Sequence, residues 1–207
     1  MMRIVLFSGG LDSACLLYHL KATLDEDETK PMAIFIDYGQ KNKDKELSAV
    51  TRLCSEWNVK LHIIDCSKIF NSVNSAILKT SSEEHGVLQD ELPNRNAVLI
   101  SIAASHVPIY EEAVIYVAAH KTSAPYADAT RQFYTRMNRL ISYSTTGRVS
   151  VEAPFINMTK YALTKQAYME GISKQELEHT VSCYEGTSCG RCPACINRKE
   201  VLDKLFY

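Results

Sequence analysis

Four of the seven cysteines lie close together near the end of the chain, at Cys183, Cys189, Cys192 and Cys195. Their spacing, C-x5-C-x2-C-x2-C, brings four thiols within reach of one metal ion. Four protein ligands leave no open position on a tetrahedral metal, so we expect one structural Zn²⁺ per chain. An iron–sulfur cluster is the alternative, because four cysteines also suit its ligation.

A glycine-rich string, SGGLDS at residues 8–13, lies between a short apolar run and a helical pattern. Its two glycines permit a tight turn, and the free N–H groups of the following helix favour an anion. The serine hydroxyls suit a pyrophosphate, whereas the carboxylate of Asp12 suits a Mg²⁺ ion that accompanies the phosphates. The string lacks the Gly-Lys-Ser/Thr ending of a Walker loop and the spacing of a dinucleotide fingerprint. It therefore predicts a different kind of phosphate-binding loop.

A second string, Asp37-Tyr38-Gly39-Gln40, follows the next apolar run. Ligands of open parallel sheets bind beyond the carboxyl ends of the strands, so we expect Asp37 to reach the nucleoside part of ATP. The residues predicted to bind the nucleotide are Phe7, Ser8, Gly9, Gly10, Leu11, Asp12, Ser13 and Asp37.

The elements that must position these residues alternate between strand and helix patterns. The expected strands are 3–7, 32–36, 59–65, 113–119 and 149–153. The expected helices are 11–24, 41–57, 96–109, 128–143, 159–169, 173–179 and 195–205. Asp128 is the expected cap of the fourth helix, and residues 173–176 have the capping-box pattern.

This alternation predicts an α/β fold, an open parallel sheet with helices on both faces and right-handed crossovers. The last third is helical and contains the cysteine cluster, so a small C-terminal helical zinc lobe is expected. We expect one domain over residues 1–207, with a nucleotide-binding core at 1–155 and the lobe at 156–207. The polar segment 80–92 is expected to be a long loop.

The composition limits the class of protein. The chain is 46% hydrophobic, and its formal net charge is −1, which argues against stable binding to nucleic acid or to an anionic membrane. No segment reaches the roughly 20 apolar residues of a membrane span, and residues 1–7 are too short for a signal peptide. We therefore expect a cytoplasmic protein, in which Cys15, Cys54 and Cys66 are small buried apolar residues rather than disulfide partners.

Four strings in this order resemble the pattern of the 7-cyano-7-deazaguanine synthase family, part of the ATP-pyrophosphatase-loop superfamily. The family pattern has SGGxDS, DYGQ, PxRN and a terminal CY followed by CGxCxxC. This chain has them at residues 8–13, 37–40, 93–96 and 183–195, with Arg198 near the end. The match spans nearly the whole chain. The resemblance implies a fold like that of the adenine-nucleotide alpha-hydrolases, and a homodimer.

The resemblance also implies an ATP-dependent C–N ligase acting on small molecules. ATP adenylates 7-carboxy-7-deazaguanine, ammonia displaces the leaving group to give an amide, and a second activation with loss of water gives 7-cyano-7-deazaguanine. Arg95 would then bind the substrate carboxylate bidentately and Asn96 the base edge, although both could instead cap the following helix. The implied catalytic residues are Ser8, Asp12, Ser13 and Arg95, and the implied substrate-binding residues are Arg95, Asn96 and Asp128.

The chain departs from the family after the fourth expected strand. The family has YPDCRPEF where residues 126–133 read YADATRQF, and Ala118 replaces a common glycine. The usual acidic residue is missing from residues 120–125, where His120 is either a pocket acid or base or a loop residue.

This divergence leaves the acceptor of the activated acid open. One alternative is transfer of the activated deazaguanine to a protein amine, or service in DNA modification. Thiolation of tRNA or lysidine formation shares the phosphate loop, but the net charge and the lack of a basic tail disfavour it. A zinc-stabilised binding module without activity is the non-enzyme alternative, and the intact Ser8, Asp12 and Ser13 argue against it.

Overall fold

Five parallel strands form the centre of the computed structural model, which describes residues 1–25, 29–79, 81, 90–122, 126–185 and 188–207. The strands are β1 (Met2–Leu6), β2 (Met32–Asp37), β3 (Lys60–Asp65), β4 (Ala113–Tyr116) and β5 (Val149–Glu152). Their order across the sheet is β3-β2-β1-β4-β5, and every neighbouring pair is parallel. The strand order therefore reverses between β1 and β4, which is where such sheets form their ligand crevice.

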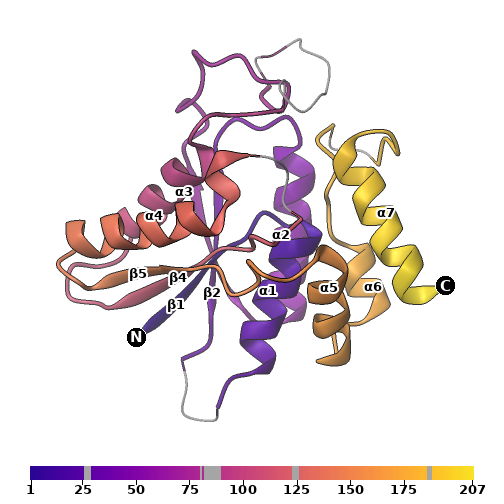
Figure 1. Cartoon of the computed structure of the whole chain (residues 1–207), viewed down its shortest axis with the longest axis horizontal. Coiled ribbons are helices and arrows are strands. Elements are labelled where there is room, and N and C mark those ends of the chain that lie inside the picture. Colours follow the sequence, from indigo (N-terminus) through magenta and orange to yellow (C-terminus); the bar gives the residue numbers. More distant parts are fainter. Residues whose placement is uncertain (26–28, 80, 82–89, 123–125, 186–187) are drawn as a thin grey trace.

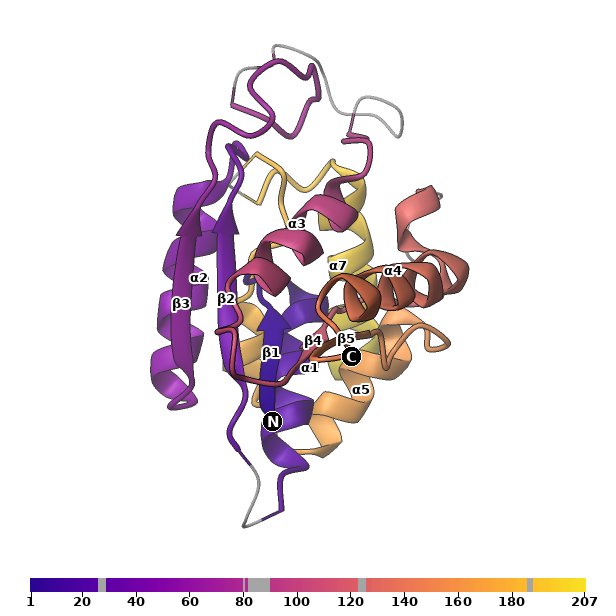
Figure 2. The same ribbon diagram turned by 90° about the vertical axis from the view of Figure 1, so that its left-hand side faces the viewer.

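Helices cover both faces of this sheet. They are α1 (Leu11–Ala22), α2 (Lys43–Glu56), α3 (Arg95–Ser105), α4 (Arg131–Ser144), α5 (Lys160–Met169), α6 (Lys174–Glu178) and α7 (Pro193–Phe206). α3 and α4 lie against one face, and α1 and α2 lie against the other (Figures 1 and 2). α5 packs on α1, and α7 packs on α5, so the C-terminal helices form an outer layer. The predicted α/β class with an open parallel sheet is confirmed.

The side chains of β1 alternate between two apolar layers. Ile4 packs in the layer that contains Ile100 of α3, whereas Val5 packs in the layer that contains Leu17 of α1. Both faces of the strand are buried, which explains why its sequence is almost continuously apolar.

The C-terminal helices share the core of the sheet. Leu163 of α5, Leu177 of α6 and Val201 of α7 belong to the same buried cluster as Leu17 of α1. Residues beyond 155 therefore pack directly on the face of the sheet that carries α1. The division into a core at 1–155 and a lobe at 156–207 stays a prediction.

One expected helix cap was wrong. Asp128 does not cap α4, because it lies in a short 3-10 helix, Ala127–Ala129. Thr130 is the N-cap instead, and its Oγ1 accepts a hydrogen bond from Phe133 N at 3.2 Å. Threonine and aspartate are both good caps, so the sequence alone did not separate these two neighbouring positions.

Other boundaries shift by a few residues for local reasons. α3 ends at Ser105 rather than near 109, since Pro108 lacks an N–H and disfavours helical backbone in the residue before it. α7 begins at Pro193, a residue type favoured in the first helical turn. The capping box of α6 is confirmed by the Ser173 Oγ and Glu176 side-chain bonds. Most of the expected loop 80–92 lies outside the described residues.

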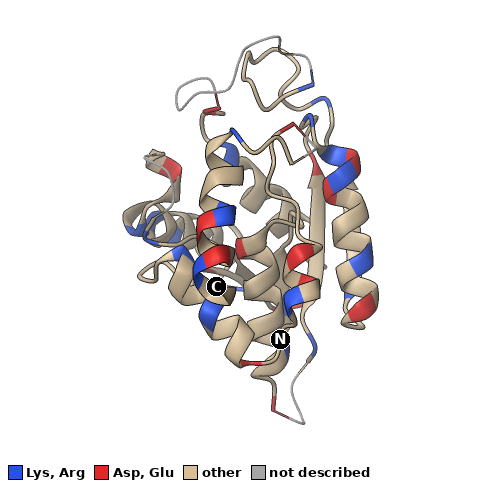
Figure 3. Cartoon of the chain, turned by 90° about the vertical axis from the view of Figure 1, so that its right-hand side faces the viewer, with Lys and Arg blue, Asp and Glu red and all other residues tan. Residues whose placement is uncertain are grey.

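Charged side chains of both signs are interspersed along the helices of the face that carries α7 (Figure 3). This mixture agrees with a formal net charge of −1 and gives that face no single sign. Among the described residues, no helix combines the length and the apolar character that crossing a bilayer requires.

Replacing Leu163 by alanine tests whether α5 belongs to the core. Leu163 is fully buried, so Leu163→Ala should lower the free energy of unfolding by about 2–5 kcal/mol through the cavity that it leaves. Urea unfolding measures this change. Lys165→Ala, at an exposed position of the same helix, should stay within about 0.5 kcal/mol of the parent. Equal effects of the two substitutions would contradict a shared core.

Candidate functional site

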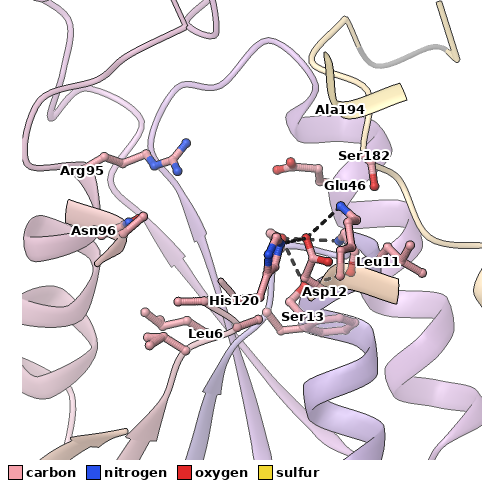
Figure 4. Close-up of a pocket in the computed structure, with 18 of the residues that line it drawn as sticks. Leu6, Leu11, Asp12, Ser13, Glu46, Arg95, Asn96, His120, Ser182 and Ala194 are labelled. Carbon is pink, nitrogen blue, oxygen red and sulfur yellow. Dashed lines mark hydrogen bonds and ion pairs between the residues drawn. The ribbon is translucent and has the colours of Figure 1, made fainter. Parts of the chain in front are cut away.

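A cavity of about 640 Å³ opens at the carboxyl edge of the sheet, between the ends of β1 and β4 (Figure 4). Its walls come from the turn after β1, the segments after β2 and β4, and the first turns of α3, α5 and α7. Residues that are far apart in the sequence therefore meet at the reversal of the strand order, as expected for an open parallel sheet.

The turn between β1 and α1 presents a helix N-terminus to this cavity. Gly9 has a φ of +75°, and Gly10 is the N-cap of α1. Ser13 Oγ donates to Gly10 O at 3.1 Å, and the hydroxyls of Ser8 and Ser13 are 3.2 Å apart. Ser8, Gly10, Leu11 and Ser13 line the cavity around N–H groups that suit an anion, whereas Gly9 is not among the lining residues. Their predicted binding of the nucleotide stays a prediction.

Asp12 lies between two basic side chains in the cavity (Figure 4). Its Oδ2 atom is 3.0 Å from Lys160 Nζ and 3.5 Å from His120 Nε2. Although burial opposes ionisation, the charge of Lys160 and the contact with His120 lower the pKa of Asp12. Asp12 is therefore a carboxylate at neutral pH. Among the described residues, its buried Oδ1 atom has no hydrogen-bond partner.

Lys160 is a site residue that sequence reasoning missed. It is the first residue of α5, 14% of its side chain is exposed, and it lines the cavity. No motif marks it, and only the packing of α5 on α1 brings it to Asp12. His120, for which two roles were open, is buried, lines the cavity and shares a 3.0 Å contact with Thr122 Oγ1 through Nδ1.

Glu46 is a second missed residue, and it lies beside the turn between β1 and α1. Its oxygens accept hydrogen bonds from Gln40 Nε2 and Asn42 Nδ2, both at 2.9 Å. Burial raises the pKa of Glu46 to about 7, and the two amides only partly offset this effect. A carboxyl of the cavity wall therefore changes charge near neutral pH.

Arg95 enters the cavity from the side opposite Asp12, at the start of α3 (Figure 4). It is half-buried and hydrogen-bonded to Tyr38. Although burial opposes the charged form, Tyr38, Tyr184 and Asp128 raise the pKa of Arg95. Four cavity tyrosines lie close enough to interact with its charge, namely Tyr38, Tyr126, Tyr134 and Tyr184.

Asn96 and Asp128 are hydrogen-bonded to each other. Asn96 N donates to Asp128 Oδ2 at 3.0 Å, and Asn96 Nδ2 donates to Asp128 O at 2.8 Å. The carboxylate of Asp128 thus caps the first turn of α3. Asn96 lines the cavity, whereas Asp128 is not among the lining residues, and their predicted binding of substrate stays a prediction.

Asp37 ends β2, as expected, but its side chain serves its own turn. Its Oδ1 accepts a hydrogen bond from Gly39 N at 3.0 Å, while the neighbours Tyr38 and Gln40 line the cavity. The predicted contact between Asp37 and the nucleoside stays a prediction.

The four clustered cysteines form a second centre beside the cavity. Their sulfur atoms all lie within 4.8 Å of one another. Cys189 Sγ accepts from Cys192 N, and Cys192 Sγ accepts from Cys195 N, both at 3.4 Å. Backbone N–H groups lower the pKa of Cys189 to about 6, whereas burial raises the pKa of Cys195 to about 12. Four thiols this close suit a metal ion, which supplies the positive charge that keeps them deprotonated.

The whole chain matches one family of proteins. The family model described as "Queuosine biosynthesis protein QueC" matches residues 2–206. The chain belongs to this family. The 7-cyano-7-deazaguanine synthase of Caldicellulosiruptor saccharolyticus is 33% identical to the QueC-family chain, over 99% of the chain and 92% of the relative. The enzymes of the same name from Persephonella marina and Aquifex aeolicus are each 34% identical, over 96% of the chain and 91% and 95% of the relatives.

A solved structure shares the fold of this QueC-family chain. The U34-tRNA thiolase NcsA from Methanococcus maripaludis, solved with its 4Fe–4S cluster, matches 98% of the chain and 65% of its own length, with a TM-score of 0.50. The sequence identity is 14%, so the likeness concerns the fold alone.

Loss of one cysteine should lower both the metal content and the thermal stability of the QueC-family chain. In Cys192→Ser the serine can still cap α7, so any loss of stability reports the missing thiolate rather than the cap. Metal analysis should give less metal per chain, and thermal unfolding a lower midpoint. Cys66→Ser, outside the cluster, should keep the parent's metal content. Metal loss without a change in midpoint would contradict the coupling of binding to folding.

Glu46 should make stability depend on pH. Its folded pKa of about 7 exceeds the ordinary value of 4.5, so the folded state binds more protons between these values. The free energy of unfolding should therefore fall as pH rises through this window, by up to about 3 kcal/mol. Urea unfolding from pH 5 to 8 should show this fall relative to Glu46→Gln. Exposed Glu112→Gln should run parallel to the parent, and three parallel curves would refute the prediction.

Proposed function

We propose that this chain is a 7-cyano-7-deazaguanine synthase, an ATP-dependent C–N ligase that converts 7-carboxy-7-deazaguanine and ammonia to the nitrile. The observation that carries the proposal is one cavity with the glycine turn after β1 on one side and Arg95 on the other. Three relatives with 33–34% identity bear this enzyme name. They favour this reaction over transfer of the activated acid to a protein amine or service in DNA modification.

The turn after β1 would bind the phosphates of ATP. The backbone N–H groups at the start of α1 and the hydroxyls of Ser8 and Ser13 would donate to their oxygens, and Phe7 and Leu11 contribute apolar wall. Lys160 would move from Asp12 to the phosphates, where its charge offsets the negative charge that develops as pyrophosphate leaves. The unpartnered Oδ1 of Asp12 suits the Mg²⁺ that accompanies ATP.

The acceptor acid would lie across the cavity from this turn. Arg95 would hold its carboxylate by two parallel hydrogen bonds, with one oxygen aimed at the α-phosphate. That oxygen attacks phosphorus and pyrophosphate departs, which leaves an acyl adenylate. Ammonia then attacks the carbonyl carbon, loses a proton, and expels AMP to give the amide. A second adenylation at the amide oxygen releases pyrophosphate and one N–H proton, and loss of the remaining N–H proton together with AMP gives the nitrile.

The four cysteines would hold one structural zinc ion. Tetrahedral ligation at about 2.3 Å separates neighbouring sulfurs by about 3.8 Å. Sulfur atoms that all lie within 4.8 Å of one another suit such a single ion. A cubane cluster would spread them further, because each thiolate binds a different iron. The bound ion would join Cys183 and Cys189 to the start of α7 and take no part in the reaction.

A homodimer in the cytoplasm completes the proposal. Large apolar side chains are exposed on α4 and in the loop before β4, among them Leu140, Tyr143 and Tyr110, and such groups are typical of subunit contacts. A reducing compartment keeps the cysteine ligands available for the metal.

One incubation tests the reaction and its key cation. The chain with ATP, Mg²⁺, ammonium and the deazaguanine acid should form a product about 19 mass units lighter than the acid, by mass spectrometry. Lys160→Met should lower kcat by at least about 100-fold, because it removes a preorganised charge. Lys165→Met, exposed on the same helix, should keep the parent's rate. No product from the parent chain under saturating substrates would refute the proposed function.

A further inference from the structure

Residues 181–183 run directly along the phosphate-binding turn and lead into the cysteine cluster. Val181 N donates to Gly9 O at 2.8 Å. A Cβ on Gly10 would lie 3.5 Å from Val181 O, so the two backbones are in close contact. The first metal-ligand candidate, Cys183, is therefore two residues from a backbone bond to the turn.

Asn42 forms a second connection between the same two regions. Its side chain is buried at the start of α2, and 6% of the residue is exposed. Its Nδ2 donates to Cys183 O and to Glu46 Oε1, both at 2.9 Å. One buried amide thus holds the backbone of a cysteine of the cluster and a side chain of the cavity wall.

The far side of the cluster also reaches the cavity. Cys192 is the N-cap of α7, and the residues that follow, including Ala194 and Asn197, line the cavity. Arg198 of the same helix donates through Nη2 to Leu177 O at 2.8 Å and to Thr180 O at 3.2 Å. The loop that holds the cysteines is therefore fixed at both ends against the nucleotide side of the fold.

We propose that Asn42 is a positioning residue that couples metal binding at the four cysteines to nucleotide binding at the turn after β1. A metal ion fixes the backbone of Cys183 and the first turn of α7, and Asn42 and Val181 transmit that order to the cavity. Such coupling is reciprocal, so a nucleotide in the cavity must tighten the hold on the metal by the same factor. The inference rests on the proposed ATP site.

A purely structural role for Asn42 makes a different prediction. A bond that only stabilises the fold would lower the free energy of unfolding without changing how nucleotide affects metal release. The two roles separate in the ratio of metal-release rates without and with nucleotide, because global stability cancels from that ratio.

The experiment uses the metal-loaded chain and a chromogenic chelator. Metal release is timed with and without saturating α,β-methylene ATP and Mg²⁺, and nucleotide binding is measured by calorimetry on the same samples. The parent chain should release metal at least about fivefold more slowly with nucleotide. Asn42→Ala should reduce this ratio to within about twofold of one. Asn42→Asp, which keeps the shape but replaces the donor, should do the same if the alanine variant does not fold.

Asn138→Ala is the matched control. Asn138 is also an asparagine whose side chain bonds a backbone group, with Oδ1 accepting from Val151 N at 2.8 Å, but it lies in α4 on the other face of the sheet. This variant should keep the parent's ratio. Nucleotide binding without any slowing in the parent, or full slowing in Asn42→Ala, would overturn the coupling alone. No nucleotide binding by the parent would overturn both the coupling and the proposed function.

Discussion

Gly9 is the point on which the candidate site depends. Its φ of +75° is a backbone conformation that L side chains rarely adopt. A Cβ at this position would lie 3.0 Å from Glu46 O and 3.1 Å from Val50 Cγ2, so α2 can lie against the turn only because the side chain is absent. The carbonyl of the same residue accepts the bond from Val181. One glycine therefore sets the spacing of the turn after β1, α2 and the segment that leads to the cysteines.

Lys160 and Arg95, the two cationic side chains described above, have partners of different kinds. Each side chain therefore suits a different kind of anion. Lys160 is paired with the carboxylate of Asp12, so under the proposed function a phosphate would replace one anionic partner of Lys160 with another, and a metal cation would take the place of Lys160 at Asp12. Arg95 is hydrogen-bonded to the phenol of Tyr38, a neutral group that a carboxylate can displace without leaving a buried negative charge behind. Lys160 and Arg95 thus each have a partner within the cavity before substrates bind.

The sequence was informative wherever the signal was local. The apolar runs, the glycine turn and the cysteine spacing each lie within a few residues, and the elements and the sulfur cluster were found where they were expected. Lys160 and Glu46 were missed because their importance arises from packing between distant elements, α5 on α1 and α2 on the turn. The sequence predicted the correct edge of the sheet for Asp37. Its carboxylate, however, accepts a hydrogen bond from Gly39 N, because the backbone of the turn brings the two groups together.

Gly39 has a consequence for how such a cavity can diversify. With a φ of +90° and room for no side chain, since a Cβ would lie 2.7 Å from Ser67 O, it holds the turn that carries Tyr38 against the end of β3. This wall of the cavity is consequently fixed by close backbone contact with the segment that follows β3. Residues 126–130 belong to no strand and contribute Tyr126 and Ala129 to the lining of the cavity. Replacement of side chains in residues 126–130 can therefore reshape the cavity while the turns after β1 and β2 keep their backbone contacts.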